Sequence, residues 1–315
     1  MFSELSAFHS LKEYQYVGFG STYFSDFSLF HKNLGIDDMV SIEQDKENKI
    51  RFMFNRPYSC IKMEFESSND ILPSLDWGKP SIAWLDYDIP LDAGMLQDLT
   101  TLGANMQSGS LILISVNAHH LPVKAKTNEE TWGIRLKELE ERVTPERIPL
   151  GTTGKNLNAK GNSDVYKDII TNEIKSVLKI RNGDTLVSSQ NYLHYKEVVN
   201  IVYQDGAKML TVGGLIFSGN DISKYAATDI ENLDFVREEG SKSLEILIPN
   251  LTFREIHKLE SHLPNNINME NGNVIDGELV EGESTNSLFD IVPKEDVEKF
   301  ADFYRYFPRF TESNV

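Results

Sequence analysis

The sequence has almost no cysteine. Cys60 is the only one among 315 residues, which excludes an intramolecular disulfide framework and a cysteine-rich zinc site. The chain also lacks a run of about 18 apolar residues, the length that a membrane-spanning helix needs. Its first 15 residues show neither a basic start nor an apolar core, so no signal peptide is expected. These absences together predict a cytoplasmic protein that does not enter a membrane.

Positive charge is scarce as well. The chain carries 31 Lys and Arg residues against 48 Asp and Glu residues, a formal net charge of -17. Proteins that bind free DNA or RNA usually present a basic surface, because counterion release from phosphates dominates their affinity. The charge therefore argues against free nucleic acid as the main partner. The apolar share of 40% is ordinary for a globular protein.

Patterns typical of strands and helices alternate through the first 120 residues. They predict strands at 13–19, 39–43, 60–66, 81–88 and 110–118, and helices at 22–35, 45–56 and 90–109. This β-α-β alternation favours a parallel, doubly wound sheet. Farther along, two β-rich runs flank Asp205 and Gly206, and Asp-Gly is a strong hairpin signal. The predicted fold is α/β: a Rossmann-like, doubly wound, mostly parallel sheet that ends in an antiparallel hairpin.

Two helices carry more detailed expectations. For the helix at 22–35, Ser21 or Thr22 can cap the start and Gly35 can end it. For the helix at 45–56, the four apolar side chains are expected to face inward: Ile50, Phe52, Met53 and Phe54.

The predicted domain boundaries lie where the alternation of strand and helix patterns ends. Residues 1–225 are expected to form the α/β domain, in which 119–162 is a variable insertion on the substrate side. Residues 226–315 are expected to form a small α+β extension. Within the extension, the stretch 265–287 is rich in Asn, Gly and acidic residues and is expected to be a flexible loop.

The stretch "VGFGST" at 17–22 joins the first strand to the first helix. Gly18 and Gly20 allow a ligand to approach the backbone, and a helix N-terminus suits a phosphate or a carboxylate. A dinucleotide fingerprint needs a third glycine where this chain has Tyr23, which argues against a nicotinamide or flavin dinucleotide.

Polar residues also follow three of the other strands. Glu43 closes the second strand, 25 positions after Gly18, where an acid can bind ribose hydroxyls. The stretch "SSND" at 67–70 follows the third strand, and "WLDYD" at 84–88 ends the fourth. Ligands of open α/β sheets bind outside the carboxyl ends of the strands, so these residues predict one common site.

These features together resemble the class I S-adenosylmethionine-dependent methyltransferases. The stretches "YFSDFSLFHKNLGIDDMVSIE", "RFMFNRPYSCI" and "WLDYD" look more narrowly like a group of bacterial O-methyltransferases. The resemblance covers residues 14–217 and implies O-methyl transfer from S-adenosylmethionine to an unidentified acceptor, a small molecule or a protein.

The resemblance also implies roles for particular residues. Gly18, Phe19, Gly20 and Ser21 would wrap the amino acid end of the cofactor, Glu43 would take the ribose hydroxyls, and Ser68 and Asn69 would lie near the adenine. Asp86, Tyr87 and Asp88 would face the sulfonium and the acceptor, with Asp86 also counted as cofactor-binding. A hydroxyl acceptor would gain from Asp86 or Asp88 as base. Those two aspartates alone do not establish a metal site, and none is expected.

Two alternatives stay open on the sequence. The chain could be a non-catalytic cofactor-binding or regulatory protein on a methyltransferase scaffold, because a fold does not fix a function. It could also be a partner subunit in a bacterial defence complex, given its acidic composition and the aromatic helix near its end. A protein partner or a homo-oligomer is compatible with either.

Overall fold

A computed structural model describes residues 1–237, 240–247, 249–274 and 287–306. The chain separates into two compact units, Met1–Val202 with Ala207–Leu244, and Tyr203–Gly206 with Glu245–Val315. Among the described residues, no helix has the length and hydrophobicity needed to cross a bilayer.

One eight-stranded sheet has the order β3-β2-β1-β4-β5-β7-β6-β8. Its strands are β1 (Gln15–Gly18), β2 (Asp38–Ile42), β3 (Ile61–Glu64), β4 (Ser81–Pro90), β5 (Ser110–Asn117), β6 (Leu193–Asp205), β7 (Ala207–Ser218) and β8 (Leu244–Leu247). The pairs from β3 through β5 are parallel, and β7 runs antiparallel to β5. The predicted parallel sheet with a closing hairpin is therefore confirmed, with Gly206 at the turn in a left-handed conformation (φ +85°).

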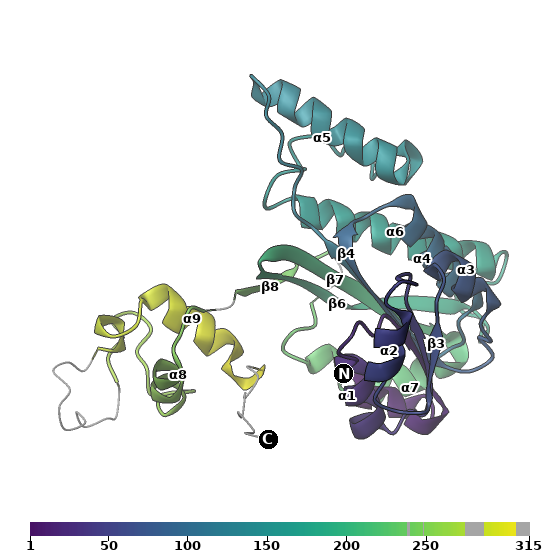
Figure 1. The fold of residues 1–315 in the computed structure, drawn as a ribbon, viewed down its shortest axis with the longest axis horizontal. Helices are drawn as coiled ribbons and strands as arrows, with labels where there is room; N and C mark the ends of the chain where they lie inside the picture. The colour runs from purple at the N-terminus through teal and green to yellow at the C-terminus, as the bar shows by residue number, and fades with distance from the viewer. Residues whose placement is uncertain (238–239, 248, 275–286, 307–315) are drawn as a thin grey trace. The chain divides into compact units, whose positions relative to one another are not determined.

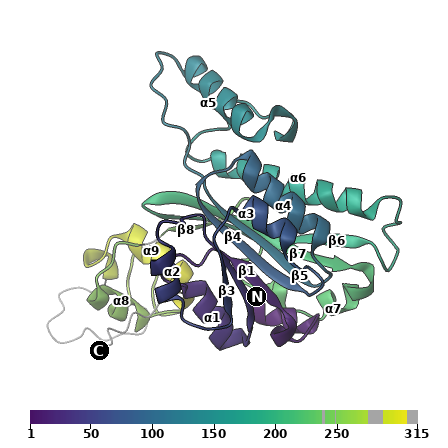
Figure 2. The same cartoon turned by 45° about the vertical axis from the view of Figure 1, so that its right-hand side comes forward.

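Helices cover both faces of the sheet in the first unit (Figures 1 and 2). Buried side chains of α4 (Ala93–Asn105) and α6 (Asn162–Asn182) pack with one face, next to α3 (Ser68–Ile71) and α5 (Asn128–Val143). The other face packs against α1 (Ser25–Leu34) and the segment around α7 (Ile222–Ala226). This three-layer arrangement explains why the central strands read as nearly continuous apolar runs, since both of their faces are buried.

The second unit has its own small core. It contains α8 (Phe253–Glu260) and α9 (Lys294–Phe303), and Leu259 and Phe300 are fully buried in it. Thr252 caps α8 as part of a capping box with Glu255, in which each side chain binds the other residue's backbone amide. Most of the loop predicted at 265–287 lies outside the described residues.

Two details of the predicted helices are wrong. In α2 (Lys49–Asn55) only Phe52 is buried, whereas Ile50 and Phe54 are 85% and 86% exposed. The helix α1 begins at Ser25 rather than directly after the glycine corner, so neither Ser21 nor Thr22 caps it. Its cap position is held by Phe24, in a left-handed conformation, while Gly35 ends the helix as predicted.

Backbone contact between β5 and β7 gives a direct test of this sheet. A Cβ at Gly213 would collide with the carbonyl oxygen of Ile112 on the neighbouring strand. We expect Gly213→Ala to destabilise the protein by about 3 kcal/mol, the upper end of ordinary single substitutions, because the strands must separate. Urea unfolding measures this.

The matched control is Gly133→Ala. Gly133 lies exposed within α5, and apart from its two chain neighbours and the backbone of the helix itself nothing lies within 4 Å of the position that a Cβ would take there. Alanine at this position should stabilise the helix by about 0.5–1 kcal/mol. Equal effects of the two substitutions would contradict the close packing of β5 against β7.

Candidate functional site

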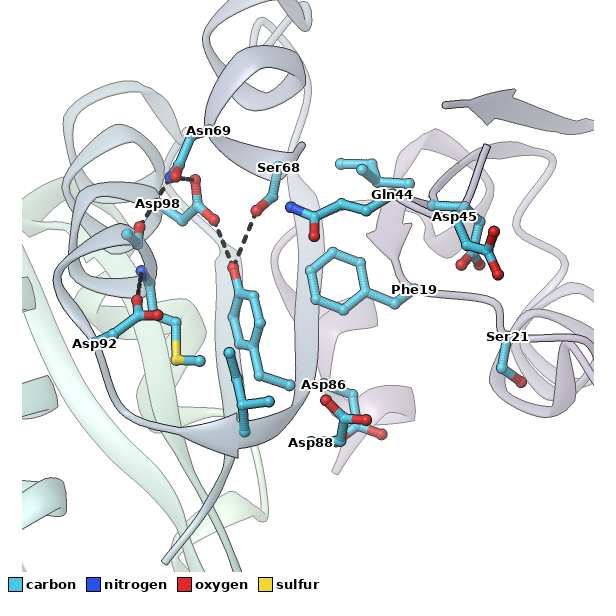
Figure 3. A pocket seen from close by; sticks show the side chains of 16 residues that line it. Phe19, Ser21, Gln44, Asp45, Ser68, Asn69, Asp86, Asp88, Asp92 and Asp98 are labelled. Atoms are coloured by element: carbon cyan, nitrogen blue, oxygen red, sulfur yellow. Dashed lines mark hydrogen bonds between the residues drawn. The ribbon is translucent and has the colours of Figure 1, made fainter. Parts of the chain in front are cut away.

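A cleft of about 680 Å³ lies beyond the carboxyl ends of β1, β2 and β4 (Figure 3). Sixteen residues line it: Phe19, Ser21, Ile42, Glu43, Gln44, Asp45, Ser68, Asn69, Asp86, Tyr87, Asp88, Ile89, Asp92, Gly94, Met95 and Asp98. Six of these carry a carboxyl group, and none is Lys, Arg or His. The cleft is therefore suited electrostatically to a cationic ligand.

Most of the predicted site residues meet in this cleft. Its lining includes eight of the ten residues singled out from the sequence: Phe19, Ser21, Glu43, Ser68, Asn69, Asp86, Tyr87 and Asp88. Gly18 and Gly20 are not part of the lining. The stretch at 67–70 begins a short helix: Ser67 caps α3, which carries Ser68 and Asn69.

The two glycines are required by the protein's own packing. A Cβ at Gly18 would lie 2.6 Å from the hydroxyl oxygen of Tyr16, and a Cβ at Gly20 would lie 2.5 Å from the ring of Phe24. The amide of Gly20 also donates to Ser41 Oγ at 3.1 Å. The glycines thus shape the turn, while the flanking Phe19 and Ser21 present side chains to the cleft.

Glu43 stands one residue past β2 and is half-buried. It accepts a hydrogen bond from Ser41 Oγ at 3.3 Å. Burial raises its pKa, while hydrogen bonds from Ser41 and from the backbone amides of Ser21 and Gly20 pull that pKa down. Glu43 is therefore fixed against the glycine corner, which holds its carboxylate at the mouth of the cleft.

Asp86 and Asp88 lie near the end of β4, side by side in Figure 3. Burial raises the pKa of Asp86, a hydrogen bond from Ser115 lowers it, and the charge of Asp88 raises it. Because Asp86 is still exposed to the cleft, solvent limits this effect. Neither residue caps the following helix, since Asp92 does so by accepting from the amide of Met95 at 3.0 Å.

Asp98 is a site residue that the sequence patterns did not single out. It is 1% exposed and lies on α4, among the buried apolar side chains of that helix. Tyr87 Oη donates to its Oδ2 at 2.5 Å, and Asn69 Nδ2 donates to its Oδ1 at 2.6 Å. The signal that could have revealed it is an acid within the apolar stripe that runs from Met95 to Leu102.

This network determines what Tyr87 can do. Burial, and then the charge of Asp98 beside it, raise the pKa of Tyr87 far above its usual range, so the phenol stays protonated. Its hydroxyl points toward Ser68 and Asp98, and its ring stands edge-on to Phe19 with centroids 4.9 Å apart. Tyr87 is thus placed to hold the wall of the cleft rather than to accept a proton.

A second buried pair lies behind the glycine corner. Tyr16 is fully buried and donates a short hydrogen bond from its hydroxyl to Asp26, in the first turn of α1. Burial raises the pKa of Asp26 most strongly, and the charge of Asp86 raises it further, which places both carboxyl groups in one electrostatic environment. Asp26 therefore adds to the acidity of this end of the sheet.

The whole sequence matches the model of one protein family. A family model described as "Putative O-methyltransferase" matches residues 1–315. The chain belongs to this family. The mostly parallel sheet of this chain, with its antiparallel final strands, is the α/β fold expected of S-adenosylmethionine-dependent methyltransferases.

The chain also resembles solved structures, but only at low sequence identity. The LepI complex with SAM is 12% identical, with a TM-score of 0.36 over 68% of this chain and 46% of that one. PigF with SAH is 13% identical, with a TM-score of 0.32 over 67% of this chain and 60% of that one. The chain thus spans less than two thirds of the length of either. No curated protein matches the sequence.

The hydrogen bond between Tyr87 and Asp98 can be tested by stability. Tyr87→Phe leaves the buried carboxylate without its hydroxyl donor, which should cost about 1–3 kcal/mol at pH 7.5. Burial raises the pKa of Asp98, so the folded state takes up a proton at a higher pH than the unfolded chain does. The cost should therefore shrink as the pH falls and Asp98 becomes protonated.

Tyr23→Phe is the matched control, because Tyr23 is 81% exposed. Its effect should stay within about 0.5 kcal/mol as the pH falls. A cost for Tyr87→Phe that does not change from pH 7.5 down to the most acidic pH at which the wild-type protein stays folded would show that Asp98 is not the partner responsible. Urea unfolding over this pH range provides the measurement.

Proposed function

We propose that this chain transfers a methyl group from S-adenosylmethionine to an oxygen atom of an acceptor bound at the cleft. The observation that carries the proposal is a cleft lined by six carboxyl groups and no basic side chain, at the carboxyl ends of β1, β2 and β4. Membership of an O-methyltransferase family supports the reaction class.

The residues present fit this cofactor. S-adenosylmethionine carries a sulfonium and an ammonium group, and the acidic lining would stabilise both positive charges. A volume of about 680 Å³ lies within the range usual for small-molecule sites. Glu43 would accept hydrogen bonds from the ribose hydroxyls, while Ser68 and Asn69 would lie by the adenine. Phe19 and Ser21 would contact the amino acid end, on a turn shaped by Gly18 and Gly20.

The bound cofactor would supply a methyl group that is already electrophilic. The chain's own part is to position the acceptor and to take its proton. As the new O–CH₃ bond forms and the S–CH₃ bond breaks, Asp86 or Asp88 would accept the hydroxyl proton. Burial raises the pKa of Asp86, which brings the carboxylate closer to the basicity that suits proton transfer near neutral pH.

Calorimetry with two ligands tests the cofactor site. Glu43→Gln keeps the shape of the side chain but removes its charge. It should weaken S-adenosylmethionine binding about 10- to 100-fold, the loss expected for a hydrogen bond to a charged group. S-adenosylhomocysteine has no sulfonium, so its affinity should depend less on the remaining carboxylates but still require Glu43 for the ribose.

Asp45→Asn is the control, since Asp45 lies on the same lining, is exposed and is already engaged by Asn48. Its effect on either ligand should be less than about 3-fold, as for a solvent-screened charge. Equal losses in the two variants would mean that the cleft attracts a cation only through its overall charge. An absence of heat with folded wild-type protein would refute the site.

Turnover tests the reaction itself. Methyl-labelled S-adenosylmethionine is incubated with the protein and either a panel of phenols and catechols or a fractionated bacterial extract. We expect label to appear in an ether or ester product. Asp86→Asn or Asp88→Asn, whichever removes the base, should lower kcat about 10²- to 10⁴-fold.

Asp45→Asn again serves as the control with near-normal turnover. Tight cofactor binding with no transfer to any acceptor would instead support a non-catalytic regulatory protein, or a subunit that acts only with a partner. Label in an amine product would show that the acceptor atom is nitrogen and not the proposed oxygen.

A further inference from the structure

Three potential metal ligands meet at the opposite end of the same strands. His31 lies in the last turn of α1, Asp37 directly precedes β2, and Cys60 directly precedes β3. His31 Nδ1 is 3.0 Å from Asp37 Oδ1 and 3.7 Å from Cys60 Sγ, and all three ligand atoms lie within 4.8 Å of one another. The cofactor cleft is at the carboxyl ends of these strands, so the cluster is a separate site.

The two distances from His31 Nδ1 are close to those around a tetrahedral ion. Zinc binds nitrogen at about 2.0–2.1 Å, oxygen at about 2.0–2.2 Å and sulfur at about 2.3 Å. Tetrahedral angles then place nitrogen and sulfur ligands about 3.5 Å apart, and nitrogen and oxygen ligands about 3.4 Å apart. The observed 3.7 Å and 3.0 Å differ from these values by a few tenths of an ångström, which small side-chain rotations can absorb.

We propose that His31, Asp37 and Cys60 bind one divalent cation of the zinc class. The ligand set of nitrogen, oxygen and sulfur selects a borderline-soft ion, because Mg²⁺ and Ca²⁺ prefer oxygen ligands alone. Three protein ligands leave a fourth position, open to water or to the Ile36 carbonyl oxygen, which lies 3.1 Å from the same His31 nitrogen.

The surroundings of the cluster hold its ligands in place. The ring of Tyr58 packs at a tilt of 40° against the imidazole of His31, with centroids 4.3 Å apart, and both His31 and Cys60 are partly buried. Without a cation, Nδ1 of His31 pairs with Asp37. Burial, together with the charge of Asp37, keeps the pKa of the Cys60 thiol above its usual value. Coordination by a dication would displace the thiol proton, as is general for metal-bound thiols.

Binding there would join three segments that are distant in the sequence. The cation would link the end of α1, the approach to β2 and the start of β3, which are otherwise connected by hydrogen bonds and packing alone. An ion that binds the folded state and not the unfolded chain raises stability. The site is thus a structural clamp on the sheet edge, and it does not depend on the proposed methyl transfer.

The test uses the tag-free full chain, stripped of metal by a chelator and kept reduced, and titrated with Co²⁺ and then Zn²⁺. Wild-type protein should bind one Co²⁺, with a near-ultraviolet thiolate-to-cobalt absorption band and the visible bands of four-coordinate cobalt. Zn²⁺ should displace the Co²⁺ and raise the Tm. No thiolate band at a 1:1 ratio would overturn the proposal.

Two variants assign the ligands. Cys60→Ser should abolish the thiolate band and weaken Zn²⁺ binding at least 10-fold. Asp37→Asn is the safer second variant, because the Asp37 side chain is 74% exposed and surface substitutions usually change stability little; it should weaken Zn²⁺ binding and keep the band. His257→Ala, which removes an exposed histidine from the second unit, should change neither. A band that survives in Cys60→Ser, or Zn²⁺ affinity unchanged in Asp37→Asn, would refute this ligand set.

Discussion

The parallel register of the first sheet strands is the constraint on which the candidate site depends. Gly18 of β1 is level with Ser41 of β2 on one side and with Trp84 of β4 on the other. Two residues farther along the chain from these three come Gly20 and Glu43, just beyond β1 and β2, and Asp86, within β4. A carboxylate from each neighbouring strand is therefore placed beside the glycine turn. A slip of one residue in either pairing would turn these side chains to the opposite face of the sheet.

Bringing acids together has an electrostatic cost that the structure offsets only in part. Burial raises the pKa of Asp26, Glu43, Asp86 and Asp98 alike. Two of them accept a hydrogen bond from a tyrosine hydroxyl, Asp26 from Tyr16 and Asp98 from Tyr87. A neutral donor stabilises a carboxylate without cancelling its charge. The remaining field at Glu43 and Asp86 is thus available to a cationic ligand.

Much of this arrangement could be predicted from the sequence because it depends on local patterns. Strand periodicity, the Asp-Gly turn and the position of acids at strand ends predicted the sheet and the meeting of Glu43 with Asp86. The inward face of α2 could not be predicted in the same way. Ile50 and Phe54 are four residues apart and form one helical face, and Phe52 forms another. Tertiary packing buries Phe52 alone of these three, although the other helical face carries two of the three apolar side chains.

The residues that the sequence did not reveal depend on contacts between distant elements. Asp98 belongs to the cleft only because α4 packs beside α3, which brings Asn69 within 2.6 Å of it. The glycines were expected to clear space for a ligand, but the bulky rings of Tyr16 and Phe24 use that space. A glycine motif alone does not distinguish room for a ligand from room for the protein's own side chains.

The cluster of His31, Asp37 and Cys60, at the other end of the strands, could not be predicted from the sequence for the same reason. Cys60 looked like an isolated thiol because its partners lie 29 and 23 positions earlier in the chain. The parallel pairing of β2 with β3 brings the starts of both strands to one edge, and α1 returns to that edge before β2 begins. Parallel pairing of β1 with β2 and β4 gathers acids at the carboxyl ends of the strands, and parallel pairing of β2 with β3 gathers three different ligand atoms at the opposite edge. Because the first set offers only carboxylate oxygens and the second adds nitrogen and sulfur, the two ends of the sheet favour chemically different cations.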